Sequence, residues 1–126
     1  PLISTTDRDK IFLDKINAII ERNMGDAEFK LDTYAPALGL GRTTFYSKLK
    51  SIVGCSPNEY VRLLRMKRAA ELLITSDINI SEAGYQVGIN DPFYFSKCFK
   101  NTFGKSPSQY RKSAGKSDTE ESAGEE

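Results

Sequence analysis

Hydrophobic residues recur every three or four positions along most of this chain of 126 residues, which is the spacing of helices with one buried face. The first such run covers residues 7–23 and predicts an amphipathic helix whose apolar stripe holds Phe12, Ile16, Ile19 and Ile20. No apolar run approaches the roughly 18 residues that a membrane-spanning helix needs. We therefore expect an all-α fold that begins with this helix.

Short helices separated by glycine turns follow the first helix. Asp32 is placed to cap a second helix, which contains Tyr34, Ala35 and Leu38. Pro36 lacks the backbone N–H that a continuous helix needs, so this helix should start late or bend. After a tight turn at 39–41, a third helix is expected over residues 42–52, ended by a left-handed cap at Gly54.

The sequence from Ser56 carries strong signals for the start of a helix. The Ser56 hydroxyl can cap the helix, Pro57 suits its first position, and Glu59 can complete a capping box. The long helix that follows, to about Ser76, has apolar positions on one side, namely Tyr60, Val61, Leu64, Ala69, Leu72 and Leu73. Basic residues occupy the rest of this helix and are expected to face solvent: Arg62, Arg65, Lys67 and Arg68.

Residues 45–62 are repeated, without a gap, at residues 95–112. The alignment pairs Phe45 with Phe95, Lys50 with Lys100, Gly54 with Gly104, Ser56 with Ser106, Pro57 with Pro107 and Tyr60 with Tyr110. A period of about 50 residues, with both copies basic and helix-patterned, indicates two similar binding units rather than one catalytic cleft.

The second copy repeats the local signals of the first. Ser81 stands where Asp32 stands in the first copy, and a short helix carrying Ala83, Val87 and Ile89 leads into a turn at Gly88. Asp91 and Pro92 then start a helix over residues 92–102, which ends at Gly104. The residues from Ser106 to Gln109 start a short last helix.

A short helix, a glycine turn and a second helix with basic and hydroxyl side chains form a helix-turn-helix unit, here at 32–53 and 81–103. We expect seven helices in five segments: a linker and first helix at 1–29, the first helix-turn-helix at 30–55, a connecting helix at 56–77, the second helix-turn-helix and final helix at 78–113, and a disordered acidic tail at 114–126.

The connecting helix has the length that two-groove DNA binding requires. Residues 57–76 would form a helix of about 30 Å at 1.5 Å per residue. Successive major grooves on one face of a duplex lie about 34 Å apart. A rigid helix of this length could place the second helix of each unit in neighbouring grooves of double-stranded DNA.

The distribution of charge favours a polyanionic partner. The net charge of the chain is only +1, but residues 42–112 hold 12 Lys and Arg against 5 Asp and Glu, whereas the segments on either side are net acidic. A positive field of this kind is typical of nucleic-acid binders. A helical protein-interaction module, with its basic face docked on an acidic partner, is the alternative that these residues leave open.

The sequence contains no pattern typical of a catalytic site or a metal site. The chain contains no histidine, and Cys55 and Cys98 lie 43 residues apart with no C-x-x-C pair. We expect no cofactor, no metal site and no enzymatic activity in this chain, and two reduced cysteines in a cytoplasmic protein. The chain opens on Pro1 rather than Met, and we expect it to be part of a longer protein.

The second helix of each unit separates into core and outward positions. Helical spacing assigns Phe45, Leu49, Phe95, Phe99 and Phe103 to the core. The outward positions are Arg42, Thr43, Thr44, Tyr46, Ser47 and Lys50 in the first unit, and Pro92, Phe93, Ser96, Lys97 and Lys100 in the second. A single exposed charge is usually just solvated, and Phe93 either contacts a thymine methyl or a sugar or folds back into the core.

Three segments carry a resemblance to a known family: L-G-L-G-R-T-T-F-Y-S-K-L-K, G-C-S-P-N-E-Y-V-R-L-L-R-M-K-R-A-A-E-L-L and V-G-I-N-D-P-F-Y-F-S-K-C-F-K-N-T-F-G-K-S-P-S-Q-Y-R. Over residues 30–112 the chain resembles the DNA-binding domain of AraC/XylS-type transcription regulators. It is most similar to the output domain of hybrid two-component regulators, many of which control carbohydrate-utilisation genes. The resemblance implies an upstream histidine kinase, dimerisation through upstream domains, and RNA polymerase as a candidate partner.

The resemblance also implies roles for the outward residues. Base reading is expected from Thr43, Tyr46, Ser47, Pro92, Phe93, Ser96 and Lys97. Phosphate contacts are expected from Arg42, Thr44, Lys50, Asn90, Lys100 and Lys105. The operator sequence, the signal, and the choice between activation and repression do not transfer with the family.

Overall fold

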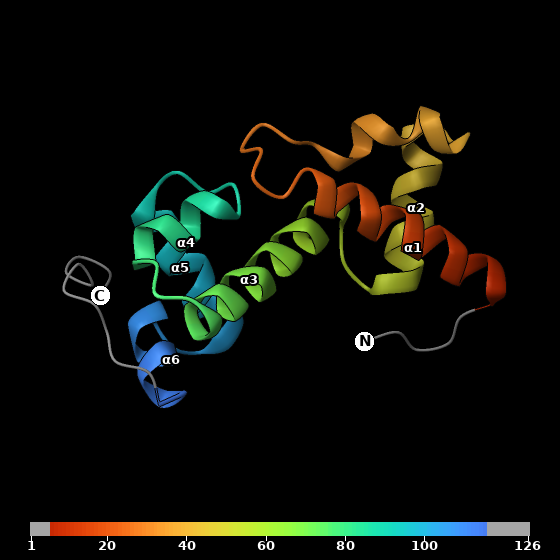
Figure 1. Cartoon of the computed structure of the whole chain (residues 1–126). Helices are drawn as coiled ribbons and strands as arrows, with labels where there is room; N and C mark the ends of the chain where they lie inside the picture. The colour runs from red at the N-terminus through yellow and green to blue at the C-terminus, as the bar shows by residue number, and fades with distance from the viewer. Residues whose placement is uncertain (1–5, 116–126) are drawn as a thin grey trace. The chain divides into compact units, whose positions relative to one another are not determined.

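The computed structural model describes residues 6–115, and this part of the chain consists of helices and connecting loops, with no strand (Figure 1). It divides into two compact units. Unit 1 comprises residues 6–23 and Glu28–Arg62, and unit 2 comprises Met24–Ala27 and residues 63–115. The all-α prediction is confirmed, but six α-helices and two 3-10 helices stand where we expected seven helices. The predicted acidic tail lies, from residue 116 on, outside the described residues.

Unit 1 opens with the predicted amphipathic helix, α1 (Asp7–Arg22). The Thr6 hydroxyl caps α1 by accepting a hydrogen bond from the backbone N–H of Asp9 at 3.1 Å. The predicted stripe is confirmed, with Phe12, Leu13, Ile16, Ile19 and Ile20 buried. A second polar contact within unit 1 joins α1 to the start of α3 (Pro57–Thr75), where the Tyr60 hydroxyl donates to Asn17 Oδ1 at 2.6 Å. Burial of this ring raises the pKa of the Tyr60 hydroxyl.

The predicted second helix is replaced by two 3-10 helices, η1 (Leu31–Tyr34) and η2 (Pro36–Leu38). Pro36 has no N–H to donate and its ring disfavours a preceding turn of α-helix, so the chain forms two tighter turns instead. The cap prediction at Asp32 was also wrong, because Asp32 lies inside η1 and the N-cap residue, Lys30, makes no side-chain cap bond. Gly39 then turns the chain at a positive φ of 76°.

The next two helices begin and end as their local signals predict. Helix α2 (Arg42–Val53) ends at Gly54, which has a φ of 85°. The capping box of α3 is present, with Ser56 N–H donating to Glu59 Oε1 at 2.9 Å and Glu59 N–H donating to Ser56 Oγ at 3.2 Å. These hydrogen bonds hold the pKa of the Glu59 carboxyl below its usual range. One of the boundaries between the units falls within α3, between Arg62 and Leu63.

In unit 2, α4 (Ile80–Gln86) is capped by a residue that we did not predict. Asn79, not Ser81, is the N-cap: Asn79 Oδ1 accepts from Glu82 N–H at 2.9 Å, and Asn79 N–H donates to Glu82 Oε1 at 3.1 Å. Ser81 lies inside the helix, at an exposed position. The spacing of Asn79 and Glu82 is that of a capping box, so the correct signal was present in the sequence.

The remaining two starts are confirmed. Helix α5 (Pro92–Phe103) is capped by the Asp91 carboxylate, and α6 (Pro107–Ser113) by a capping box between Ser106 and Gln109. In the core of unit 2, Phe95 and Phe99 have no exposed surface. Phe103, which we placed in the core, is half-buried, and its ring lies 4.7 Å from that of Phe99 and 5.2 Å from that of Tyr110.

Arg65 was predicted to face solvent and instead is buried, with 8% of its surface exposed. Its Nη1 donates to the backbone oxygen of Gly88 at 3.0 Å, and its Nη2 donates to that of Asp26 at 2.9 Å. Burial lowers the pKa of the Arg65 guanidinium, and the nearby Asp26 charge opposes this change. The guanidinium therefore anchors the turn that precedes α5.

A second buried arginine, Arg111, hydrogen-bonds to backbone oxygens at and after the C-terminal end of α3. Arg111 has no exposed surface, and its Nε donates to the backbone oxygen of Leu73 at 2.9 Å. Its Nη2 donates to Ile78 O at 2.7 Å and lies 3.4 Å from Ser76 O. A cation at the C-terminus of a helix satisfies carbonyls that have no partner within the helix and interacts favourably with the helix dipole. Arg111 thereby ties α6 to the loop that leads into α4.

The two turn glycines, Gly39 and Gly88, provide a matched test of the role of Arg65 in anchoring the turn before α5. Gly39 and Gly88 have similar φ values of 76° and 84°. A Cβ added at Gly39 meets nothing within 4 Å, whereas one at Gly88 would collide with the Arg65 guanidinium and lie 2.8 Å from Met24 O. We expect Gly39→Ala to lower the free energy of unfolding by about 1 kcal/mol, and Gly88→Ala by about 3 kcal/mol. Urea unfolding measures both, and equal losses would contradict the role given to Arg65.

Candidate nucleic-acid interface

Helix α2 presents one face to the core of unit 1 and the other to solvent. Phe45 and Leu49 have no exposed surface. The residues expected to touch DNA lie on the opposite side and are all exposed, namely Arg42, Thr43, Thr44, Tyr46, Ser47 and Lys50. The structure thus brings the predicted readers of unit 1 together on a single accessible surface.

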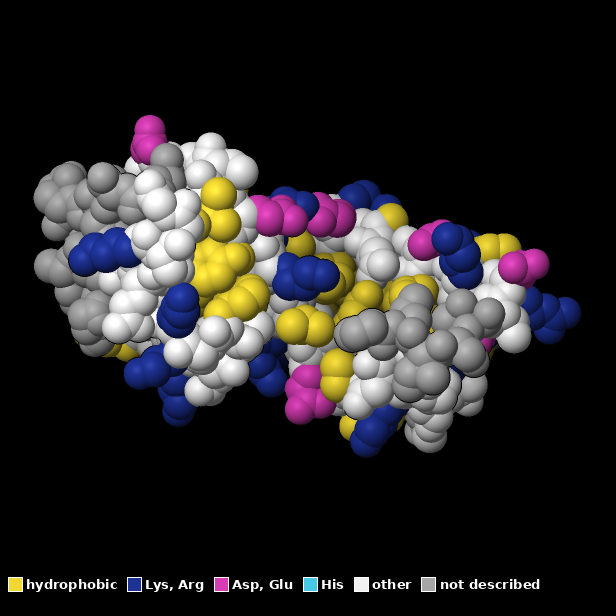
Figure 2. All heavy atoms as spheres, turned by 90° about the horizontal axis from the view of Figure 1, so that it is seen from below, with side chains coloured by type: hydrophobic (Ala, Val, Ile, Leu, Met, Phe, Trp, Pro, Cys, Tyr) yellow, Lys and Arg dark blue, Asp and Glu magenta, His cyan; other side chains and the backbone are white. Residues whose placement is uncertain are grey.

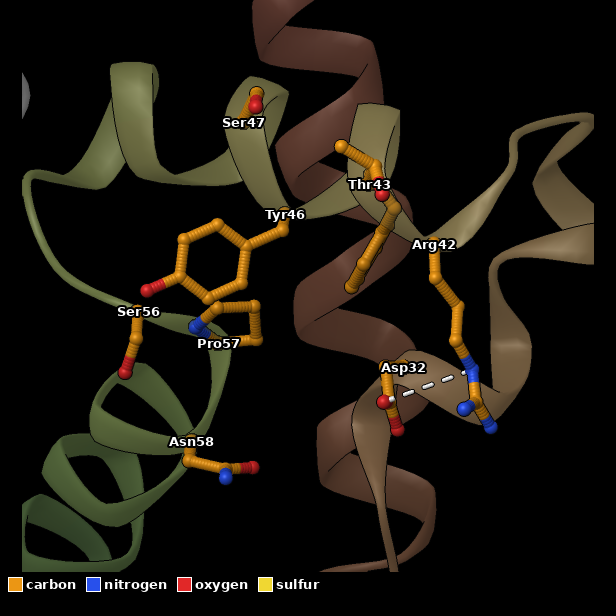
Figure 3. Close-up of a pocket in the computed structure, with 9 residues that line it drawn as sticks. Asp32, Arg42, Thr43, Tyr46, Ser47, Ser56, Pro57 and Asn58 are labelled. Atoms are coloured by element: carbon orange, nitrogen blue, oxygen red, sulfur yellow. Dashed lines mark ion pairs between the residues drawn. The ribbon is translucent and has the colours of Figure 1, made fainter.

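A pocket of about 370 Å³ opens beside these residues, within unit 1 (Figure 3). Thr43, Tyr46 and Ser47 line it from α2. Across from them lie Ser56, Pro57 and Asn58 at the start of α3, and the Tyr46 ring lies beside Pro57 (Figure 3). We gave these three residues no binding role from the sequence, because Ser56 and Pro57 read as helix-start signals and an exposed Asn58 carries no pattern of its own.

Ion pairing and ring contacts orient the cations around this surface. Arg42 Nε lies 3.7 Å from Asp32 Oδ2, so Asp32, wrongly predicted as a cap, instead forms an ion pair with a second residue of the pocket lining (Figure 3). Lys50 Nζ lies 5.9 Å from the centroid of the Tyr46 ring, within the range of a cation–π contact. Lys48 instead lies 4.6 Å over the Phe12 ring of α1, so it belongs to the packing of unit 1.

Helix α5 is arranged in the same way in unit 2. Phe95 and Phe99 are buried, while Pro92, Phe93, Lys97 and Lys100 are exposed, as are Asn90 and Lys105 in the flanking loops. Phe93 keeps 74% of its surface exposed, so of the two alternatives for this ring, folding back into the core is wrong. The counterpart of Tyr46, by the repeat, is Ser96, whose Oγ is buried and has no hydrogen-bond partner among the described residues.

Basic and hydrophobic side chains share the surface of the described residues. On the face drawn in Figure 2, Lys and Arg side chains are spread among Asp and Glu, and hydrophobic side chains emerge between them. Among residues 6–115 no group of three or more His, Cys, Asp or Glu side chains is placed to hold a metal ion. No helix in this part of the chain is long and apolar enough to cross a membrane.

Known proteins that are similar to this chain include DNA-binding domains and transcription regulators. A family model described as a helix-turn-helix domain matches residues 34–113. The C-terminal domain of AraT, a response regulator from Geobacillus stearothermophilus, superposes with a TM-score of 0.73 at 28% identity over 86% of this chain and 87% of that one. The DNA-binding domain of AdpA, solved in complex with a target DNA, gives a TM-score of 0.72 at 27% identity over 80% of this chain and 90% of that one.

Similarity at the sequence level extends to a much longer protein. Histidine kinase P4 from Formosa agariphila is 43% identical over 109 residues, which are 86% of this chain but only 8% of that protein. The chain thus spans a small part of the length of this relative. The family model matches most of the chain, residues 34–113, and solved domains share its fold with two helix-turn-helix units. The chain therefore belongs to the AraC-type helix-turn-helix family.

Proposed function

We propose that this chain binds double-stranded DNA sequence-specifically, as the output domain of a bacterial transcription regulator acting in the cytoplasm. One observation carries the proposal: in each unit a glycine turn leads into a helix that buries an apolar face and exposes polar and basic side chains on the other. That combination is what a recognition helix needs, since it must be held rigidly while its outer face enters the major groove.

Base reading and backbone contact are divided among the exposed residues. Base contacts are proposed for Thr43, Tyr46 and Ser47 on α2, and for Pro92, Phe93 and Lys97 on α5. Ser96, the remaining reader expected from the sequence, keeps its Oγ buried and is given no base contact. Hydroxyl and ammonium groups hydrogen-bond to base edges in the major groove. Phosphate contacts, which fix the register of the protein on the duplex, are proposed for Arg42, Thr44, Lys50, Asn90, Lys100 and Lys105.

The division into units supports two separate contacts with one duplex. One boundary between the units, between Arg62 and Leu63, falls within α3, so this helix continues from the first unit into the second. We propose that this helix holds the two readers in register on successive major grooves. The five predicted segments remain our proposal for how the chain divides these roles.

We further propose that the domain works in a hybrid two-component regulator. The similarity to a histidine kinase and to the C-terminal domain of a response regulator supports this context. In such a protein, phosphorylation upstream would control DNA binding, and dimerisation would come from domains other than this one. RNA polymerase is the partner on which a regulator bound near a promoter would act.

Salt dependence tests the electrostatic part of this function. If six phosphates are neutralised, the logarithm of the affinity should fall against the logarithm of the salt concentration with a slope of about −5. Fluorescence anisotropy with a labelled duplex measures this slope over a salt series. A slope near zero would contradict phosphate binding and favour the alternative, docking of the basic face on an acidic protein.

Paired variants distinguish residues that contact base edges from residues that contact phosphates. We expect Ser47→Ala or Lys97→Ala to change sequence preference, with a loss of about 1–3 kcal/mol on the preferred duplex and little change on others. Lys50→Ala should weaken all duplexes alike and reduce the salt slope by about 1. Competition binding against a panel of duplexes makes the comparison. Equal losses on every sequence from both classes of variant would refute the division.

A further inference from the structure

Phe93 is the most exposed large hydrophobic side chain among the described residues, and it lies at the start of a recognition helix. It is the second residue of α5, and 74% of its surface is exposed. Neighbouring Pro92 is exposed as well, so this end of the helix offers an apolar surface. The aligned positions in unit 1 are Arg42 and Thr43, which are polar. The two recognition helices therefore enter the proposed interface with different chemistry.

The surroundings of Phe93 favour base edges over the phosphate backbone. The Asp91 carboxylate accepts hydrogen bonds from the N–H groups of Phe93 at 3.0 Å and Tyr94 at 3.4 Å. The free N–H groups at a helix start would otherwise attract a phosphate. Here a carboxylate occupies them, and its negative charge repels a phosphate from the same place.

The next turn of the helix supplies no competing hydroxyl. The Oγ of Ser96 is buried, although we proposed this residue as a reader from the sequence. A phenyl ring cannot hydrogen-bond to a base edge. The apolar group that the major groove presents is the 5-methyl group of thymine, and aromatic and methyl side chains are the ones that contact it.

We propose that Phe93 recognises the 5-methyl group of one thymine in the half-site bound by unit 2. This inference rests on the proposed function, because it needs α5 to enter the major groove. It adds an apolar contact to the bases read by unit 2, whereas the proposed readers of unit 1, Thr43, Tyr46 and Ser47, all carry hydroxyl groups.

Deoxyuridine substitution tests the inference at the level of one methyl group. The probe is a duplex selected for binding to this chain, in which each thymine is replaced in turn by deoxyuridine, so that base pairing is kept and only the methyl group is lost. We expect one such position to weaken binding by about fourfold, the equivalent of exposing one buried methyl group. The other positions should change affinity by less than about twofold.

Two variants identify the side chain that is responsible. Phe93→Ala should bind the thymine and deoxyuridine duplexes equally at that position, because the ring that senses the methyl group is gone. Tyr85→Ala is the matched control, since Tyr85 is an aromatic residue of the same unit, 62% exposed and outside α5. It should keep the fourfold difference. Both side chains are exposed, so circular dichroism should show unchanged folding.

Three results would overturn the inference. A methyl effect that persists in Phe93→Ala would mean that another residue senses it. Equal binding of every deoxyuridine duplex by the unchanged protein, with selectivity retained, would mean that no methyl group is read and would point to a protein contact for Phe93. Failure to bind any duplex selectively would overturn the proposed function as well, which separates the two claims.

Discussion

Burial of one phenylalanine at the same place in each unit decides which face of the recognition helix meets solvent. Phe45 in α2 and Phe95 in α5 have no exposed surface, and each has a second buried residue one turn later, Leu49 and Phe99. Burying an aromatic side chain is worth about 2–3 kcal/mol, more than any exposed contact that could turn the helix the other way. The outward face is therefore a consequence of the core, and every residue proposed to touch DNA depends on it.

The two units share this constraint but differ in the element before the turn and in the contacts around the recognition helix. In unit 1, two 3-10 helices precede the turn at Gly39, and Tyr60 hydrogen-bonds to Asn17 of α1. In unit 2, a capped α-helix precedes the turn, and the equivalent tyrosine, Tyr110, packs its ring 5.3 Å from that of Phe99. The repeat thus preserves the recognition helix while its surroundings have diverged.

Two buried arginines in unit 2 account for much of the difference between the two units. Arg65 hydrogen-bonds to backbone oxygens of Gly88 and Asp26, and Arg111 to those of Leu73 and Ile78. A buried guanidinium is tolerated because several carbonyl oxygens replace its lost hydration, and removal of such a donor would leave those oxygens unsatisfied. Unit 2 therefore holds the turn before α5 by polar contacts at long sequence separation.

Local signals predicted the helix boundaries that depend on neighbours in sequence. Gly54 and Gly104 end helices, and Ser56, Asp91 and Ser106 start them, because these roles are set within four residues. Helical spacing likewise placed Phe45, Leu49, Phe95 and Phe99 correctly in the core, whereas Phe103 is only half-buried.

The errors arose where a distant partner or a second local signal decided the outcome. Arg65 lies four residues from both Val61 and Ala69, on the buried side of α3, and its charge alone suggested exposure. Partners 23 and 39 residues away, which the sequence does not reveal, make its burial possible. Asn79 was overlooked in favour of Ser81, and Pro36, which we expected to make a helix start late or bend, is accompanied by two 3-10 helices instead. The contacts of the candidate site, such as the pair of Asp32 with Arg42, likewise required the fold.

Selection of bound duplexes from a random pool, at about 0.1 M salt, tests most directly whether both units read DNA. Such salt weakens loose phosphate contacts while specific complexes persist. If both units read DNA, two half-sites of different sequence should be enriched, separated by one helical turn of about 10 base pairs. Enrichment of a single half-site would contradict the two-reader account, and no enrichment would contradict sequence-specific binding by this domain.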